Sequence, residues 1–215
     1  MRVLYSILLA ALPLASATAG CTKDSTRAAP TTLFGRLPIA ALHLDAAGGS
    51  AMIGGESRSI VSSRLAIAFC RWPSYSVAAV GGSHATYPTT DYIASGSQSY
   101  HPELYANWSA IEVQKRWRDS SIVRPTLPVS YGEMSTEYRY SHRLSNGTWE
   151  NREEGASTAT YLASAVGVEV SLFKYMTSYL LVGARKVGAL NTPGVGSGDF
   201  DGRYVMFGFG FGKFR

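Results

Sequence analysis

Apolar and polar residues alternate along much of this chain, and the alternation is clearest in its last segment. There Phe207, Phe209 and Phe211 share one parity, whereas glycines and Met206 occupy the other. A period of two is typical of a β-strand whose faces meet different surroundings. The same reading predicts eight strands, with Pro38 interrupting the first: Leu33–Leu44, Ile60–Arg71, Tyr75–Gly82, Tyr105–Trp117, Ile122–Tyr140, Thr160–Phe173, Ser178–Leu190 and Arg203–Phe214.

The connections between these segments alternate between long and short. Long polar or Gly-rich stretches cover 45–59, 83–104, 141–159 and 191–202, and short ones cover 72–74, 118–121 and 174–177. Transmembrane barrels have long loops outside the cell and tight turns in the periplasm. The pattern therefore predicts an all-β fold, an eight-stranded antiparallel up-and-down transmembrane β-barrel.

The two parities of the strands predict a lipid-facing surface and an interior. The interior set is polar, and its charged members can form a network, because buried charges are retained when they are paired. In the strand 178–190 both parities carry a basic residue, and we place Arg185 inward, where the 175–177 hairpin would bring it near Glu169. The predicted interior network is Glu112, Arg116, Arg124, Glu169 and Arg185, and the predicted lipid-facing residues are Val113, Val168, Val170, Phe207, Phe209 and Phe211.

Aromatic residues gather near the predicted strand ends, as expected for girdles at the two membrane interfaces. One group lies beside the short turns or the C-terminal end: Trp72, Trp117, Tyr175, Tyr179 and Phe214. The other lies beside the long loops: Tyr105, Trp108, Tyr138, Tyr140, Tyr161 and Tyr204.

Composition agrees with a β-protein that has few charges. Of 215 residues, 46% are hydrophobic and only 16% are charged, which excludes intrinsic disorder. The net charge of +5 is scattered along the chain, so it predicts no nucleic-acid partner. Two cysteines and four dispersed histidines offer neither a disulfide framework nor metal-ligand spacing, and we expect no metal or cofactor.

The first residues have the features of an export signal. Arg2, an apolar stretch and the small residues Ala17-Thr18-Ala19 predict a signal peptide over 1–19, followed by a periplasmic segment over 20–32 and the barrel over 33–215. Cys21 is either lipidated or paired with Cys70, and the sequence leaves both open. No later segment approaches the ~20 apolar residues of a membrane helix, so a closed barrel is the remaining way to span a membrane.

These features resemble the small outer-membrane β-barrel proteins of Gram-negative bacteria, of the OmpA-domain and OmpX kind. The resemblance rests on the signal peptide, the loop pattern and the aromatic strand 203–215, although Arg215 follows the aromatic residue on which such strands usually end. It implies assembly by the barrel-assembly machinery and contact with outer-membrane lipid and lipopolysaccharide. It supplies no specific functional motif.

Two other classes of function remain open at this stage. The segment with His142, Ser145 and Glu150 is faintly similar to the His-x-Ser-Asn segment of lipid A deacylases, and this similarity predicts a lipid hydrolase. However, its His and Ser are three residues apart, and the pair Asn146-Gly147 is typical of a hairpin turn. A soluble lipocalin-like barrel that binds an apolar ligand would reverse the two faces and place Phe209 inside.

The sequence as a whole favours a monomeric, non-catalytic protein of the outer membrane with a structural or surface-interaction role. Eight strands enclose a space that side chains just fill, so we expect a plugged polar interior rather than a large pore.

Overall fold

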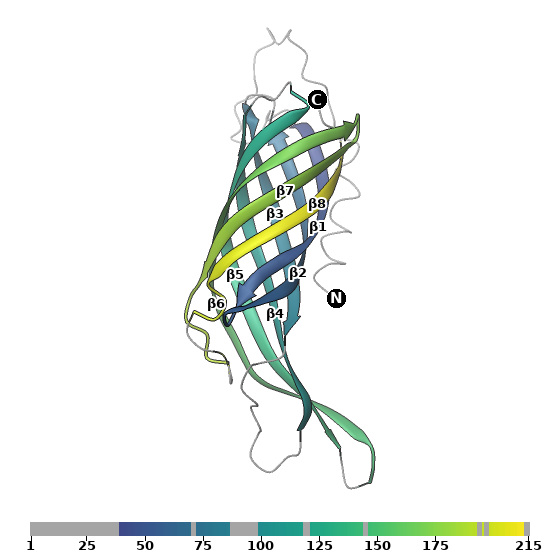
Figure 1. Cartoon of the computed structure of the whole chain (residues 1–215), viewed down its shortest axis with the longest axis vertical. Helices are drawn as coiled ribbons and strands as arrows, with labels where there is room; N and C mark the ends of the chain where they lie inside the picture. The colour runs from purple at the N-terminus through teal and green to yellow at the C-terminus, as the bar shows by residue number, and fades with distance from the viewer. Residues whose placement is uncertain are drawn as a thin grey trace, which may run out of the picture.

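The structure of this chain is a computed structural model, which describes residues 39–69, 72–86, 99–117, 121–143, 146–192, 195 and 198–212. It consists of strands that run up and down around one barrel (Figure 1). Their bounds are β1 Ile39–Ile53, β2 Glu56–Phe69, β3 Trp72–Thr86, β4 Ser99–Arg116, β5 Val123–Arg143, β6 Trp149–Phe173, β7 Met176–Val187 and β8 Gly202–Gly212.

Each strand pairs antiparallel with the next, and β8 closes the barrel by pairing with β1 from His43↔Gly212 to Ala51↔Tyr204. Closure gives every strand two neighbours and leaves the barrel wall without an open edge. The predicted eight-stranded, antiparallel, up-and-down barrel is thus confirmed. Within the described residues, no helix is both long and apolar enough to cross a membrane.

The first hairpin differs from the prediction. The stretch 45–59, predicted as a long loop, is strand on both sides of a tight turn in which Ile53 pairs with Glu56. Gly54 and Gly55 form that turn with φ of 56° and 82°, values that favour glycine and match the twist of a two-residue hairpin. The first strand accordingly continues past its predicted end at Leu44 to Ile53, and the strict alternation of long and short connections fails here. The predicted part of this strand over 33–38 lies outside the described residues.

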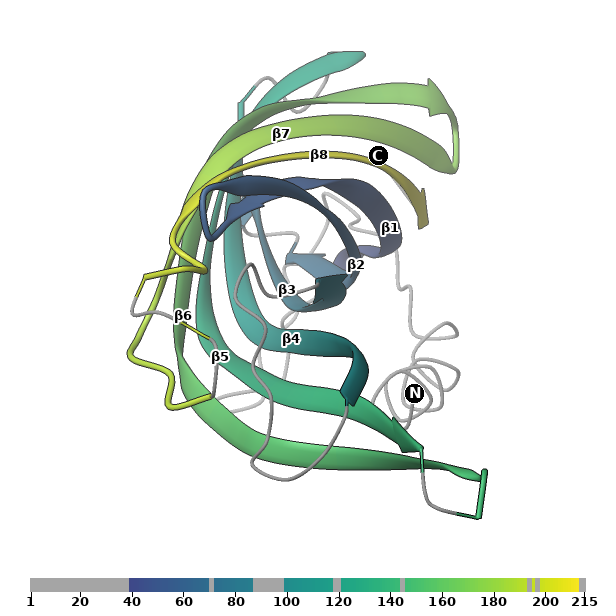
Figure 2. The same cartoon turned by 60° about the horizontal axis from the view of Figure 1, so that its bottom comes forward.

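The β5–β6 hairpin is also longer in strand than predicted. Residues 141–159 were expected to form a loop, yet β5 continues to Arg143 and β6 begins at Trp149. At the tip, Gly147 has a φ of 83°, and the Asn146 side-chain oxygen accepts a hydrogen bond from the Thr148 N–H at 3.0 Å. The two strands project beyond the barrel wall (Figures 1 and 2).

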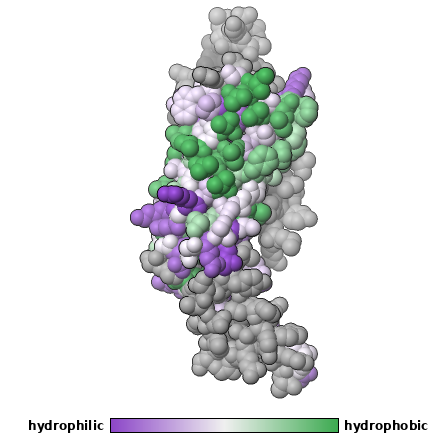
Figure 3. Space-filling model, in the orientation of Figure 1, coloured by the Kyte–Doolittle hydropathy of each residue, from purple (hydrophilic) through white to green (hydrophobic). Residues whose placement is uncertain are grey.

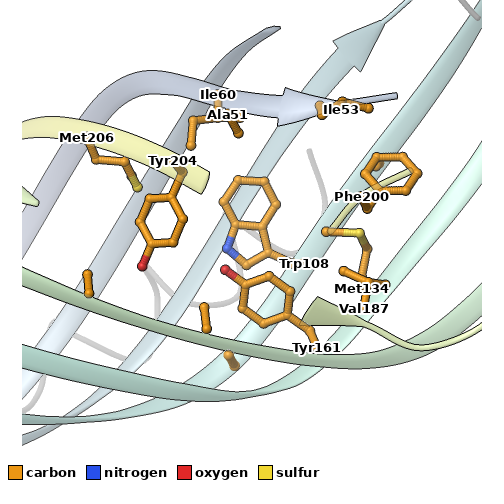
Figure 4. Packing of buried hydrophobic residues seen from close by; sticks show 14 of the residues in the cluster. Ala51, Ile53, Ile60, Trp108, Met134, Tyr161, Val187, Phe200, Tyr204 and Met206 are labelled. Atoms are coloured by element: carbon orange, nitrogen blue, oxygen red, sulfur yellow. The ribbon is translucent and has the colours of Figure 1, made fainter. Parts of the chain in front are cut away.

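Inside the barrel, glycines on one strand make room for aromatic rings on another. A Cβ on Gly183 would lie 2.7 Å from the Tyr204 ring, and a Cβ on Gly208 would lie 2.6 Å from the Tyr179 ring. A Cβ on Gly82 would overlap the Trp108 ring. The inward-facing glycines therefore allow a narrow barrel to hold large side chains, and Figure 4 shows several of them packed together.

Candidate functional site

The outward face of the barrel carries a continuous apolar belt. On β6 the belt runs from Leu162 to Leu172, which is about 34 Å along the strand at ~3.4 Å per residue and about 26 Å in height at a ~40° tilt. That height is close to the ~25 Å apolar band of membrane barrels. Figure 3 shows the green hydrophobic band over β7, β8 and β1, with purple hydrophilic residues directly below it.

Large apolar residues from every strand form this belt, and all are at least a third exposed. They are Leu44, Met52, Val61, Tyr75, Val77, Ile111, Val113, Trp117, Ile122, Val123, Leu127, Val129, Tyr131, Leu162, Val166, Val168, Leu172, Phe173, Tyr175, Leu180, Val182, Val205, Phe207, Phe209 and Phe211. Of the residues predicted to face lipid, Val113, Val168, Phe207, Phe209 and Phe211 are in this set, and Val170 is partly exposed beside them.

Charged residues lie at the two borders of the belt. Glu133, Lys186 and Arg203 are exposed at the border nearer the long hairpins. At the other border, the Lys115 ammonium lies 4.1 Å from the centre of the Tyr75 ring and the Lys174 ammonium lies 5.2 Å from that of Tyr175. Such amphipathic pairs suit the boundary between hydrocarbon and water.

The half of the barrel interior nearer the short turns holds two groups of buried ion pairs. In the first group, Arg64 joins two acids: its Nη1 lies 2.9 Å from Asp45 Oδ2, and its Nε lies 2.9 Å from Glu112 Oε1. The second contact is an ion pair whose angle does not make a hydrogen bond. Ser130 donates a hydrogen bond to Glu112 at 3.1 Å, and Arg64 also donates to Gln114.

In the second group, one acid joins two bases. Glu169 Oε2 accepts from Arg116 Nε at 3.1 Å, and Glu169 Oε1 accepts from Arg124 Nη2 at 2.6 Å. Arg124 also donates to the Ser171 hydroxyl at 2.7 Å. Across both groups, Arg64, Arg116 and Arg124 balance Asp45, Glu112 and Glu169, three positive charges against three negative ones.

The half of the interior nearer the long hairpins is mainly aromatic. His84 lies 5.2 Å from Phe200 and 6.0 Å from Trp108, measured between ring centres, and Trp108 stacks on Tyr161 at 6.2 Å. Arg185 donates from Nε to the Phe200 carbonyl at 2.8 Å. We call this group of His84, Trp108, Tyr161, Arg185 and Phe200 the outer chamber (Figure 4 labels Trp108, Tyr161 and Phe200).

Phe200 belongs to the connection between β7 and β8, which is anchored to the barrel by backbone groups. Val187 N–H donates to Asp201 Oδ1 at 2.6 Å, and Gly54 N–H donates to the Asp199 carbonyl at 2.7 Å. Leu190 and Thr192 of the same connection are buried, and the Thr192 hydroxyl hydrogen-bonds that of Thr136. The described part of this connection thus packs against the end of the barrel.

The five charged residues predicted for the interior are all buried, but they do not form one network. Arg116, Arg124 and Glu169 are joined, and Glu112 pairs with Arg64 instead. Arg185 does not meet Glu169, because β7 pairs Arg185 with Ala163 and Tyr179 with Glu169.

Sequence reasoning missed two members of the ion pairs. Asp45 lies in the stretch 45–59, which the sequence predicts as a loop but which the structure shows to be strand. Arg64 shares its parity with the buried Ala66 and Ala68, a signal that could have identified it.

Several aromatics predicted for the interface girdles lie inside the barrel. Trp108, Tyr138, Tyr161, Tyr179 and Tyr204 are buried, so the expectation for these residues was wrong. Three of them, Trp108, Tyr179 and Tyr204, fill space that facing glycines leave open. Trp117 and Tyr175 do lie on the exposed face.

The structure gives only partial information on the other candidate residues. His142 pairs with Glu150 across β5 and β6, whereas Ser145 and the His142 side chain lie outside what is described. The signal segment, Cys21 and Cys70 also lie outside the described residues. In the described ranges, no three His, Cys, Asp or Glu side chains are placed to hold a metal ion.

The sequence matches no family model and no curated protein. Solved structures that are similar to the chain in overall shape include the following three. Neisserial surface protein A (NspA) is 17% identical over 81% of this chain and 96% of its own, with a TM-score of 0.44. Ail, the attachment invasion locus protein of Yersinia pestis, solved with the heparin analogue sucrose octasulfate, is 11% identical over 80% and 97%, with a TM-score of 0.47.

The third is the N-terminal β-barrel domain of Pseudomonas aeruginosa OprF, which is 9% identical over 80% of this chain and 96% of its own, with a TM-score of 0.43. All three are eight-stranded barrels of Gram-negative outer membranes, the kind of protein that the sequence resembles. None of these likenesses identifies what this chain binds or does.

Proposed function

We propose that this protein is an outer-membrane β-barrel that has a structural or surface-interaction role and catalyses no reaction. The observation that carries the proposal is the apolar belt on a closed barrel. Exposing this belt to water would be costly, at about 25 cal/mol for each Å² of apolar surface. In lipid the same surface is satisfied, and closure of the barrel gives each strand a hydrogen-bonded neighbour on both sides.

The buried ion pairs support a filled, polar interior. Desolvated charges are stable when they are paired and hydrogen-bonded, as Glu169 is with Arg116 and Arg124. A lipocalin-like carrier would instead require the apolar face to point inward, and the exposure of Val168 and Phe209 argues against that arrangement. The interior therefore favours a plug over a wide pore or an apolar ligand pocket.

The long β5–β6 hairpin and the anchored β7–β8 connection would then lie on the cell surface, and the ends of β1 and β8 near His43 and Gly212 would face the periplasm. Export by a cleaved signal peptide, folding by the barrel-assembly machinery and contact with lipopolysaccharide belong to the same proposal. In this proposal the projecting β5–β6 hairpin makes the contacts at the cell surface.

Cell fractionation combined with gel mobility of unboiled samples tests this proposal. We expect the protein in the outer-membrane fraction, with a folded band that shifts on boiling. A soluble periplasmic protein would overturn the membrane assignment.

A variant of the belt sharpens the test. Phe209→Arg should reduce membrane insertion, since an arginine at the lipid face of a barrel near the bilayer midplane costs about 2–4 kcal/mol. Phe209→Leu is the matched control and should insert normally. If Phe209→Arg inserts as well as its control, the belt does not face lipid.

A further inference from the structure

We propose that the outer chamber is a binding site for a small anion, a chloride ion or a small carboxylate, held between the Arg185 guanidinium and the His84 imidazole. This site lies inside the barrel, and its existence does not depend on what the projecting hairpin contacts.

Arg185 supplies the first observation. The side chain is about 95% buried (5% exposed), and its Nε is occupied by the Phe200 carbonyl at 2.8 Å. Its Nη2 is buried and has no hydrogen-bond partner. In the described part of the chain, no carboxylate lies within the 4.0 Å of an ion pair with this guanidinium. The nearby Asp201 carboxylate accepts a hydrogen bond from Val187 N–H instead.

His84 supplies a second, independent observation. It is as deeply buried as Arg185, and neither Nδ1 nor Nε2 has a hydrogen-bond partner. Its ring lies 5.2 Å from the Phe200 ring, and the Arg185 guanidinium lies 5.9 Å from the same ring. The His84 and Arg185 side chains therefore pack on the same aromatic ring. A buried polar group without a partner is costly, so two of them at one place indicate an absent third group.

The charge of the interior indicates which kind of group is absent. The ion pairs deeper in the barrel balance completely, with Arg64, Arg116 and Arg124 against Asp45, Glu112 and Glu169. Among the residues that the structure describes, Arg185 is the one other buried arginine, and no carboxylate, Asp201 included, forms an ion pair with it. A buried cation without a counter-charge costs several kcal/mol, and an anion both supplies that charge and accepts hydrogen bonds from a guanidinium and an imidazole N–H. Water would satisfy the hydrogen bonds but not the charge.

The walls of the chamber limit the size of the anion. Phe200 is a buried ring beside both polar residues, and Trp108 lies beside His84 and stacks on Tyr161. The Trp108 ring already fills the space beside Gly82. The aromatic walls exclude bulk water, which strengthens the attraction of an anion to Arg185. A chloride ion or a carboxylate the size of formate or acetate suits such an enclosed site better than a nucleotide or a sugar phosphate.

The test measures the thermal unfolding midpoint of the folded full chain in detergent, followed by gel mobility. Sodium chloride, formate or acetate replaces sodium gluconate at constant ionic strength, so that screening stays the same. We expect a saturable rise of about 3 °C or more with at least one small anion. Chloride alone would identify an inorganic ligand, and a larger effect of formate or acetate would identify a carboxylate; both results support the site.

Arg185→Met should abolish the rise, whereas the matched control Arg203→Met removes an exposed arginine from the neighbouring strand and should retain it. Arg185→Lys keeps the positive charge and should retain part of the rise in the unfolding midpoint. If Arg185→Met does not fold, His84→Phe, which removes only the imidazole, should lower the affinity at least threefold. Crystals grown with bromide should show an anomalous peak at the Arg185 guanidinium. No saturable rise in the natural chain, or an equal rise in Arg185→Met, would overturn the proposal. If chloride gives the rise, the absence of bromide at Arg185 would overturn it as well.

Discussion

Replacing Glu169 with Gln tests whether the buried ion pairs stabilise the barrel. Glu169 is the only described acid that contacts Arg116 and Arg124, at 3.1 and 2.6 Å. The amide keeps the shape of the side chain but leaves two buried guanidinium groups without a counter-charge. Removing one partner of a buried ion pair costs about 3–5 kcal/mol, and two cations depend on this acid, so we expect about 5 kcal/mol.

The free energy of unfolding can be measured by urea titration in lipid vesicles, with the folded band as the signal. Glu133→Gln is the matched control, because Glu133 is exposed at the border of the belt, and it should change stability by less than about 0.5 kcal/mol. A second variant, Glu169→Gln with Arg124→Met, removes one of the stranded cations. Its cost should fall short of the sum of the single variants by about 2 kcal/mol. A loss below 1 kcal/mol in Glu169→Gln, or strict additivity in the pair, would refute this reasoning.

Two further substitutions test the packing and the first turn. Gly82→Ala should lower the free energy of unfolding by about 1–3 kcal/mol, because the new methyl group overlaps the Trp108 ring. In the control Gly48→Ala the methyl group meets no atom closer than 4.0 Å, so this variant should fold normally. Equal stabilities of the two variants in urea titrations would contradict the packing. Replacing Gly54 and Gly55 together with Ala should cost about 2–4 kcal/mol in the same titration, since both have positive φ, and an unchanged midpoint would mean that this turn tolerates ordinary residues.

The alternation of large and small residues was sufficient to predict the barrel class and the faces of β4 and β8. It failed where the chain is small on both faces. In β1, residues 46–51 are alanines, glycines and a serine, which look like loop in isolation. They form strand because β2 and β8 lie on either side and supply their hydrogen bonds.

The alternation of large and small residues failed for a different reason in the long β5–β6 hairpin. Beyond the belt, residues of both parities in 155–160 of β6 are exposed or half-buried, so the apolar alternation is lost while the pairing of β5 and β6 continues. Pairing of backbone groups does not require an apolar face.

The pairing of interior charges could not be read from parity. Parity places Arg185 and Glu169 on the inner face, but which charges meet depends on the register of neighbouring strands. That register places Arg185 opposite Ala163. The outer chamber depends further on Phe200, which lies in a connection without periodicity, and the sequence gives no sign of its burial.

Spin labels on two outward residues test most directly whether the belt faces hydrocarbon. Labels on Val166→Cys, in the middle of the belt, and on Glu133→Cys, at its border, can be compared in lipid vesicles for collision with oxygen and with a water-soluble nickel complex. Oxygen dissolves in hydrocarbon and the nickel complex does not. We expect the label at Val166 to collide mainly with oxygen and the label at Glu133 mainly with nickel. Equal access of the nickel complex to both positions would contradict the membrane barrel.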